Sequence, residues 1–351
     1  MEKFCRESVE HVQPILLYRL LARERSMEIL HNNTQQFGNY QLVHMLSQGS
    51  LADVYIGRHI RTQTLVAVKC FHGCFQGEVA EDFQRQYSTL ARLRHPHILS
   101  ILDYGIMDET AFVVTTYIPK GTLRLRHPKN TQVAPLNVLN YVQQISEALT
   151  YIHDQGLVHR DVKPQNILVD EQERLLLADF GAAIESYSLR PNHPSLHEFE
   201  GTALYAAPEQ LQGKPCRRSD QYALAIMVYE WLCGTWPFIG TFHEVAHQHL
   251  FVAPPPLAEK GHACPPNIER VICKALEKDP AQRFRTVKQF ADELEWAFKV
   301  AQATGLFEPV PSPQPPISQS QEAIYPKTEQ PQAVSQPPAQ PRRQFKGRFP
   351  N

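Results

Sequence analysis

The stretch His159-Arg160-Asp161-Val162-Lys163-Pro164-Gln165-Asn166, followed by Asp179-Phe180-Gly181, decides what this chain folds into. Transfer of a phosphoryl group needs a carboxylate that orients a hydroxyl, a cation that meets the moving group, and two oxygen ligands that hold Mg²⁺ against the phosphates. The two segments contain residues of each of these kinds. We expect those parts to be supplied by Asp161, Lys163, Asn166 and Asp179.

The residues between the two segments predict how Asp179 reaches the others. Ile167-Leu168-Val169 and Leu175-Leu176-Leu177 are short apolar runs, separated by a turn that begins at Asp170-Glu171. Two such runs predict a β-hairpin. The hairpin would deliver Asp179 beside Asp161.

The pattern HRDxKPxN followed by DFG closely resembles the protein kinase family, in its serine/threonine branch. Lys163, two positions after Asp161, favours that branch over tyrosine kinases. The segments HPHIL, SDQYALAIMVYEWLCG and KALEKDPAQRF resemble the bacterial eukaryotic-like, or Hanks-type, kinases. The resemblance spans about residues 40–300. It implies an α+β, two-lobed fold, with a small β-rich lobe carrying one main helix (about 39–118) and a larger helical lobe (about 119–300).

The resemblance also implies an activity. The chain would move the γ-phosphoryl of ATP, with Mg²⁺, to a serine or threonine of a protein, in signalling and with autophosphorylation. A homodimer could carry out that autophosphorylation in trans. The alternative is an impaired pseudokinase that acts as an interaction module.

The amino-acid composition limits which binding partners and which cellular compartment we expect. The 351 residues carry a net charge of −1, so no basic excess indicates nucleic acid. Seven scattered cysteines contain no C-x-x-C pair, which favours a reducing cytoplasm. No apolar run of about 18 residues predicts a membrane span. Residues 1–38 are expected to form an extension with a possible helix, and the Pro- and Gln-rich residues 301–351 a disordered tail.

The small lobe contains an incomplete glycine-rich loop. In the run from Leu46 to Tyr55, only Gly49 and Val54 fit the family's G-x-G-x-x-G-x-V pattern. Val66-Ala67-Val68-Lys69 matches the strand whose lysine pairs with ATP phosphates. By resemblance, Thr115 lies at the back of the nucleotide pocket, and the residues that contact ATP are Leu46, Gly49, Val54, Ala67, Lys69, Thr116, Ile118 and Leu168.

One departure from the family concerns the main helix of the small lobe. We expect this helix from Val79 to Leu93, ending before His95-Pro96 because proline disfavours a preceding helical residue. Relatives place a glutamate there that pairs with the strand lysine. Gln86 occupies that position, so Lys69 is expected to pair with an amide. Ile98 to Tyr104 and Ala111 to Tyr117 then predict two further strands.

The large lobe is expected to be mostly helical, with a long buried helix from Val138 to His153. By resemblance, Thr202 bonds near the catalytic residues, and Arg160 receives a phosphate from the activation segment, where Ser186, Ser188 and Ser195 are candidates. Resemblance also makes Asp220 a helix-start carboxylate that holds the catalytic loop, and Glu209 and Arg283 a buried structural ion pair.

A competing motif lies at His243-Glu244-Val245-Ala246-His247, which satisfies H-E-x-x-H. On a helix, this pattern puts two imidazoles on one face for zinc, with a glutamate beside the water. Glu269 could be a third ligand. The pattern has only three fixed positions, and the segment falls where kinases have a surface helix, so we favour a solvated helix over a zinc protease.

Overall fold

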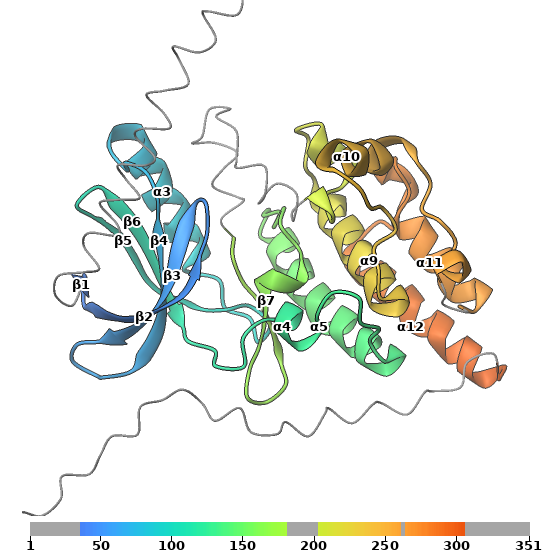
Figure 1. The fold of residues 1–351 in the computed structure, drawn as a ribbon, viewed down its shortest axis with the longest axis horizontal. Helices are drawn as coiled ribbons and strands as arrows, with labels where there is room; N and C mark the ends of the chain where they lie inside the picture. Colours follow the sequence, from blue (N-terminus) through green and yellow to red (C-terminus); the bar gives the residue numbers. More distant parts are fainter. Residues whose placement is uncertain (1–35, 181–202, 261–263, 306–351) are drawn as a thin grey trace, which may run out of the picture. The chain divides into compact units, whose positions relative to one another are not determined.

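The computed structural model describes residues 36–180, 203–260 and 264–305. The small lobe contains a six-stranded antiparallel sheet with the order β1-β2-β3-β4-β6-β5, drawn in blue to green in Figure 1. Its strands are β1 (Gln36–Phe37), β2 (Tyr40–Gln48), β3 (Ala52–His59), β4 (Leu65–Phe71), β5 (Ile101–Met107) and β6 (Thr110–Thr116).

The two faces of strand β4 have different roles, one in the hydrophobic core and one in the candidate active site. Val66, Val68 and Cys70 are buried, whereas Ala67 and Lys69 are half-buried. Successive side chains of a strand point to opposite faces, so one face of β4 packs inward. The other face carries the lysine toward the large lobe.

Helix α3 (Gly77–Leu90) contacts β5 and buries Phe83, Tyr87 and Leu90. The expected end at Leu93 is wrong by three residues. The amide of Leu93 donates to the carbonyl of Leu90 at 3.1 Å, a three-residue spacing that tightens the chain after the helix.

The boundary expected for the strand after this helix is also wrong. Strand β5 begins at Ile101, because Ile98 instead forms a parallel bridge to Leu177 in the large lobe. The loop before β5 therefore pairs with the large lobe. Strands β7 (Ile167–Val169) and β8 (Leu175–Leu177) form the expected hairpin.

The large lobe is built around α9 (Arg217–Cys233), which is buried from Ser219 onward and contacts three other helices, α5 (Pro135–Asp154), α11 (Pro266–Ala275) and α12 (Val287–Ala303). This arrangement completes the two-lobed protein kinase fold. The other elements are α4 (Leu123–Arg126), η1 (Pro164–Asn166), α8 (Pro208–Leu211), α10 (Phe242–Phe251), η2 (Leu257–Lys260) and η3 (Pro280–Gln282).

The described chain extends slightly past both expected domain limits. Strand β1 pairs with β2 before residue 39, and α12 continues to Ala303, beyond residue 300. The possible N-terminal helix and the tail after residue 305 lie outside the described residues. Among the helices of the described ranges, none combines the length and the apolar character needed to cross a bilayer.

Candidate active site

The catalytic loop is held by a carboxylate from the first turn of α9. Asp220, which is 1% exposed, accepts hydrogen bonds from the amides of His159 (2.9 Å) and Arg160 (2.8 Å). His153 of α5 lies 2.7 Å from the same carboxylate. A buried carboxylate needs such partners, because desolvation disfavours its charge. The contact joins the loop to the centre of the large lobe, as expected for Asp220.

Three of the expected catalytic side chains lie together. Lys163 Nζ is 2.8 Å from Asp161 Oδ2, and Asn166 Nδ2 donates to the same oxygen at 2.7 Å. Asn166 Nδ2 also lies 2.9 Å from the carbonyl oxygen of Asp161. The proline that starts η1 turns the chain tightly, so that Asn166 returns to Asp161.

The hairpin brings Asp179 to this group. The amide of Ala178 donates to the carbonyl of Asn166 at 2.8 Å. His159, fully buried, places Nε2 3.1 Å from the carbonyl oxygen of Ala178 and packs its ring against Phe180, 4.8 Å between centroids. Asp179 itself has a φ of +62°, a left-handed conformation that few non-glycine residues adopt.

Lys69 reaches across from β4 and binds Asp179. Its Nζ lies 2.6 and 2.8 Å from the two carboxylate oxygens. Burial, with the charge of Asp179, raises the pKa of Tyr87 well above its ordinary value. The structure places this ion pair, with Lys69 half-buried and Asp179 exposed, where the two lobes meet.

The expectation that Lys69 pairs with Gln86 is not met in this structure. Among the described residues, Lys69 hydrogen-bonds to Asp179, and Gln86 lies half-buried without a hydrogen bond to Lys69. The physical reason lies in the electrostatics, because a carboxylate is a stronger acceptor for an ammonium group than a neutral amide. The core-facing side of α3 is occupied by Phe83 and Tyr87.

The glycine-rich loop is the turn between β2 and β3. The amide of Gly49 donates to the carbonyl of Ala52 at 3.1 Å and to Asp53 Oδ1 at 3.3 Å. Asp53, only 4% exposed, also lies 3.0 Å from His72 Nε2. Sequence reasoning missed Asp53 and His72, and the only available signal was an acidic residue near the start of a strand whose next residues are Val54, Tyr55 and Ile56.

The residues expected around ATP lie on the small-lobe sheet and at the hinge, except for Leu168, which lies in β7 of the large lobe. Val54 is opposite Lys69 in the β3–β4 register, and Ala67 is opposite Thr115 in the β4–β6 register. Val54, Ala67, Thr115, Ile118 and Leu168 are half-buried, whereas Leu46 and Thr116 are exposed. Their contacts with a nucleotide stay a prediction.

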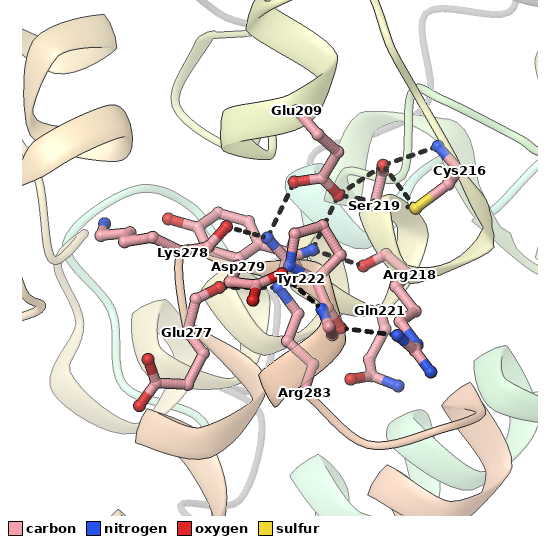
Figure 2. Close-up of polar contacts among 12 residues, drawn as sticks. Glu209, Cys216, Arg218, Ser219, Gln221, Tyr222, Glu277, Lys278, Asp279 and Arg283 are labelled. Carbon is pink, nitrogen blue, oxygen red and sulfur yellow. Dashed lines mark hydrogen bonds and ion pairs between the residues drawn. The ribbon is translucent and has the colours of Figure 1, made fainter.

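Glu209 and Arg283 form the expected ion pair, drawn in Figure 2. Arg283 Nη1 and Nη2 lie 2.7 and 2.8 Å from the two oxygens of Glu209, and Ser219 Oγ donates to Glu209 at 2.7 Å. Burial acts to raise the pKa of Glu209, but the bonds from Arg283 and Ser219 outweigh it and lower that pKa. The pair is bidentate, the strongest geometry for these groups.

The H-E-x-x-H segment is the start of helix α10. Glu244 accepts hydrogen bonds from the amide (2.8 Å) and hydroxyl (2.9 Å) of Thr241, which together cap the helix. His243 and His247 are exposed. Across residues 36–180, 203–260 and 264–305, no group of three or more His, Cys, Asp or Glu side chains is arranged to hold a metal ion. Thr202 and the three activation-segment serines lie outside these ranges.

The arrangement agrees with comparisons to known proteins. Residues 40–294, more than two thirds of the chain, match the protein kinase domain family. The chain therefore belongs to the protein kinase family, whose members use ATP and a divalent metal ion.

Its relatives include bacterial enzymes of the serine/threonine branch. Serine/threonine-protein kinase PrkC of Bacillus subtilis is 32% identical over 74% of this chain and 41% of its own length. Serine/threonine-protein kinase PknB of Mycolicibacterium smegmatis is 31% identical over 73% and 42%. Serine/threonine-protein kinase PknD of Mycobacterium tuberculosis is 34% identical over 73% and 39%. The chain thus spans about two fifths of the length of these relatives.

Proposed function

We propose that this chain is a serine/threonine protein kinase that transfers the γ-phosphoryl of ATP to hydroxyl groups of proteins. The observation that carries the proposal is the convergence of Asp161, Lys163 and Asn166 with the Lys69–Asp179 pair. These groups are a carboxylate, two cations and two oxygen ligands, as phosphoryl transfer requires.

Each side chain has a role in this proposal. Asp161 orients the attacking hydroxyl and accepts its proton, with Lys163 beside it to counter negative charge. The side-chain nitrogen of Asn166 hydrogen-bonds to Asp161, which leaves the side-chain carbonyl oxygen of Asn166 to bind a cation. Lys69 turns from Asp179 to the phosphates of the bound nucleotide.

The donor set fits Mg²⁺, which is commonly bound by one or two carboxylates together with substrate phosphates. Asp179 and Asn166 would hold the ion, and when bound it neutralises charge on the phosphates. The oxygen ligands of Asp179 and Asn166 come from adjacent chain segments, joined by the bond between Ala178 and Asn166.

The wider proposal is a signalling kinase that phosphorylates its own activation segment in trans, within a homodimer. Arg160 would then receive the phosphate, ordering that segment by a charge-assisted bond. Phosphorylation of serine or threonine, rather than tyrosine, is supported by Lys163 and by the names of the relatives. A cytoplasmic location belongs to the same proposal, because ATP is the expected phosphoryl donor.

The test is mass spectrometry of the purified chain after incubation with Mg-ATP, beside the Asp161→Asn variant. We expect added phosphate on serine or threonine in the wild type only. Equal phosphate incorporation in the two proteins would refute the proposed function and leave a binding module instead.

A further inference from the structure

Gln210, next to Glu209 in helix α8, touches the catalytic loop. Its Nε2 donates a hydrogen bond of 2.6 Å to the carbonyl oxygen of Arg160. None of the motifs considered above includes this glutamine. The bond joins the end of the activation segment to the residue directly before Asp161.

Arg160 needs such support because its backbone is strained. Its φ is +68°, in the left-handed region, which costs free energy for any residue other than glycine. Two side chains hold this conformation from opposite ends. Asp220 accepts from the amide of Arg160 at 2.8 Å, and Gln210 donates to its carbonyl.

The bond to Gln210 also acts on Asp161. The carbonyl of Arg160 and the amide of Asp161 belong to one planar peptide unit. That amide donates to His159 Nδ1 at 3.3 Å. Both polar atoms of the peptide are thus fixed, which sets the direction in which the Asp161 side chain leaves the backbone.

Helix α8 is itself held in place by Glu209. That carboxylate binds Arg283 and Ser219. Neighbouring residues of a helix point about 100° apart, so Glu209 and Gln210 serve different partners. The short helix connects an anchor in the core of the large lobe to the catalytic loop.

We propose that Gln210 is a positioning residue, an inference that rests on the proposed kinase function. Gln210 holds the peptide before Asp161. The orientation of the Asp161 carboxylate therefore depends on the position of helix α8. Loss of the bond should lower kcat while the KM for ATP stays unchanged. Gln210 would not touch the substrate or the nucleotide.

Two variants separate the hydrogen bond from packing. Gln210→Met keeps the side-chain volume but removes the donor, and we expect kcat to fall about three- to tenfold, the effect of one hydrogen bond. Gln210→Glu keeps the shape and places a negative oxygen against the carbonyl, so its kcat should fall further. If packing alone mattered, Gln210→Glu would be at least as active as Gln210→Met.

Hydrogen–deuterium exchange provides a readout that does not need activity. In nucleotide-free protein, peptides covering residues 158–163 should exchange faster in Gln210→Met than in the wild type. The control is Gln212→Met, at an exposed position just after α8, which should change neither exchange nor kcat.

The outcomes distinguish this inference from the proposed function. Unchanged exchange and unchanged kcat in Gln210→Met would overturn the positioning role even if the wild type is an active kinase. If exchange is faster in Gln210→Met than in the wild type, but the wild type transfers no phosphate, the bond to the catalytic loop is upheld. The kinase function, and with it the predicted effect on kcat, is then refuted.

Discussion

Lys69 Nζ lies 2.6 Å from Asp179 Oδ1, so the lysine expected to hold ATP phosphates is bound to the carboxylate expected to hold the metal ion. The pair joins strand β4 to the segment after β8. Lys69 must therefore exchange a carboxylate for phosphate oxygens when a nucleotide binds.

We predict that Lys69→Met lowers phosphorylation of a generic basic protein by about a hundredfold or more, the usual effect of removing a preorganised electrostatic contact. The measurement is the initial rate of phosphate incorporation. Lys120→Met is the control, because Lys120 bonds to the exposed Glu173 and should keep the wild-type rate. A Lys69→Met variant as fast as this control would contradict the assignment.

Replacement of Gln86 by glutamate should leave the kinase rate equal or raise it several-fold. A carboxylate on α3 would offer Lys69 a charged acceptor. A hydrogen bond from Lys69 to this carboxylate should be stronger by about 1 kcal/mol than one to the neutral amide. Rates should be compared with Gln84→Glu, on the exposed face of the same helix. Inactivation by Gln86→Glu, with an active wild type, would show that the glutamine has another partner.

The Glu209–Arg283 pair should contribute strongly to stability. Glu209→Gln leaves the fully buried guanidinium of Arg283 without its counter-charge, and we expect a loss of about 3–5 kcal/mol in urea unfolding at pH 7. Asp292→Asn, which breaks an exposed pair with Lys288, should cost at most about 1 kcal/mol.

The pH dependence gives this prediction a second check. The folded-state pKa of Glu209 is lowered, so the stabilisation is complete above the unfolded value near 4.3 and is lost as the pH falls through the lower folded value. The difference between wild type and Glu209→Gln should therefore shrink in acid. A difference that grows below pH 4 would contradict this sign.

His249 should make the fold sensitive to mild acid. Burial, together with the charge of Lys278, lowers its pKa to about 3, and its Nδ1 lies 2.9 Å from the Tyr222 hydroxyl. Between about pH 6.5 and pH 3, the unfolded chain binds a proton that the folded chain does not. The free energy of unfolding therefore decreases as the pH is lowered through this range.

We expect His249→Gln to reduce that slope by up to about 1.4 kcal/mol per pH unit, measured by urea unfolding from pH 7 to pH 4. His247→Gln, at an exposed position on the same helix, should leave the slope unchanged. Parallel curves for wild type and His249→Gln would refute the buried neutral imidazole.

The fold could be predicted from the resemblance to the kinase family, and the grouping of the catalytic loop could be predicted because its residues are close in sequence. Asp161, Lys163 and Asn166 share one tight turn, and a hairpin of nearby residues positions Asp179. The partner of Lys69 could not be predicted. It depends on whether Gln86 or Asp179, which come from different parts of the chain, lies nearer to Lys69 after folding.

The same reason explains the contacts that sequence reasoning missed. Asp53 lies in β3 and His72 comes directly after β4, and Gln210 reaches a backbone carbonyl, which any residue type provides. No residue pattern marks such an acceptor. The start of β5 was misplaced because His97 to Leu99 pairs with Leu177 of β8, a contact between segments that are distant in sequence.

That pairing has a consequence for dividing the chain. Leu177 donates to the carbonyl of His97 and accepts from the amide of Leu99, both at 2.9 Å. A cut at the hinge would therefore leave one fragment with a strand-like edge and the other with its complement. A cut after Lys120 would place His97 to Leu99 on one fragment and Leu177 on the other, so these two hydrogen bonds could form only between the fragments.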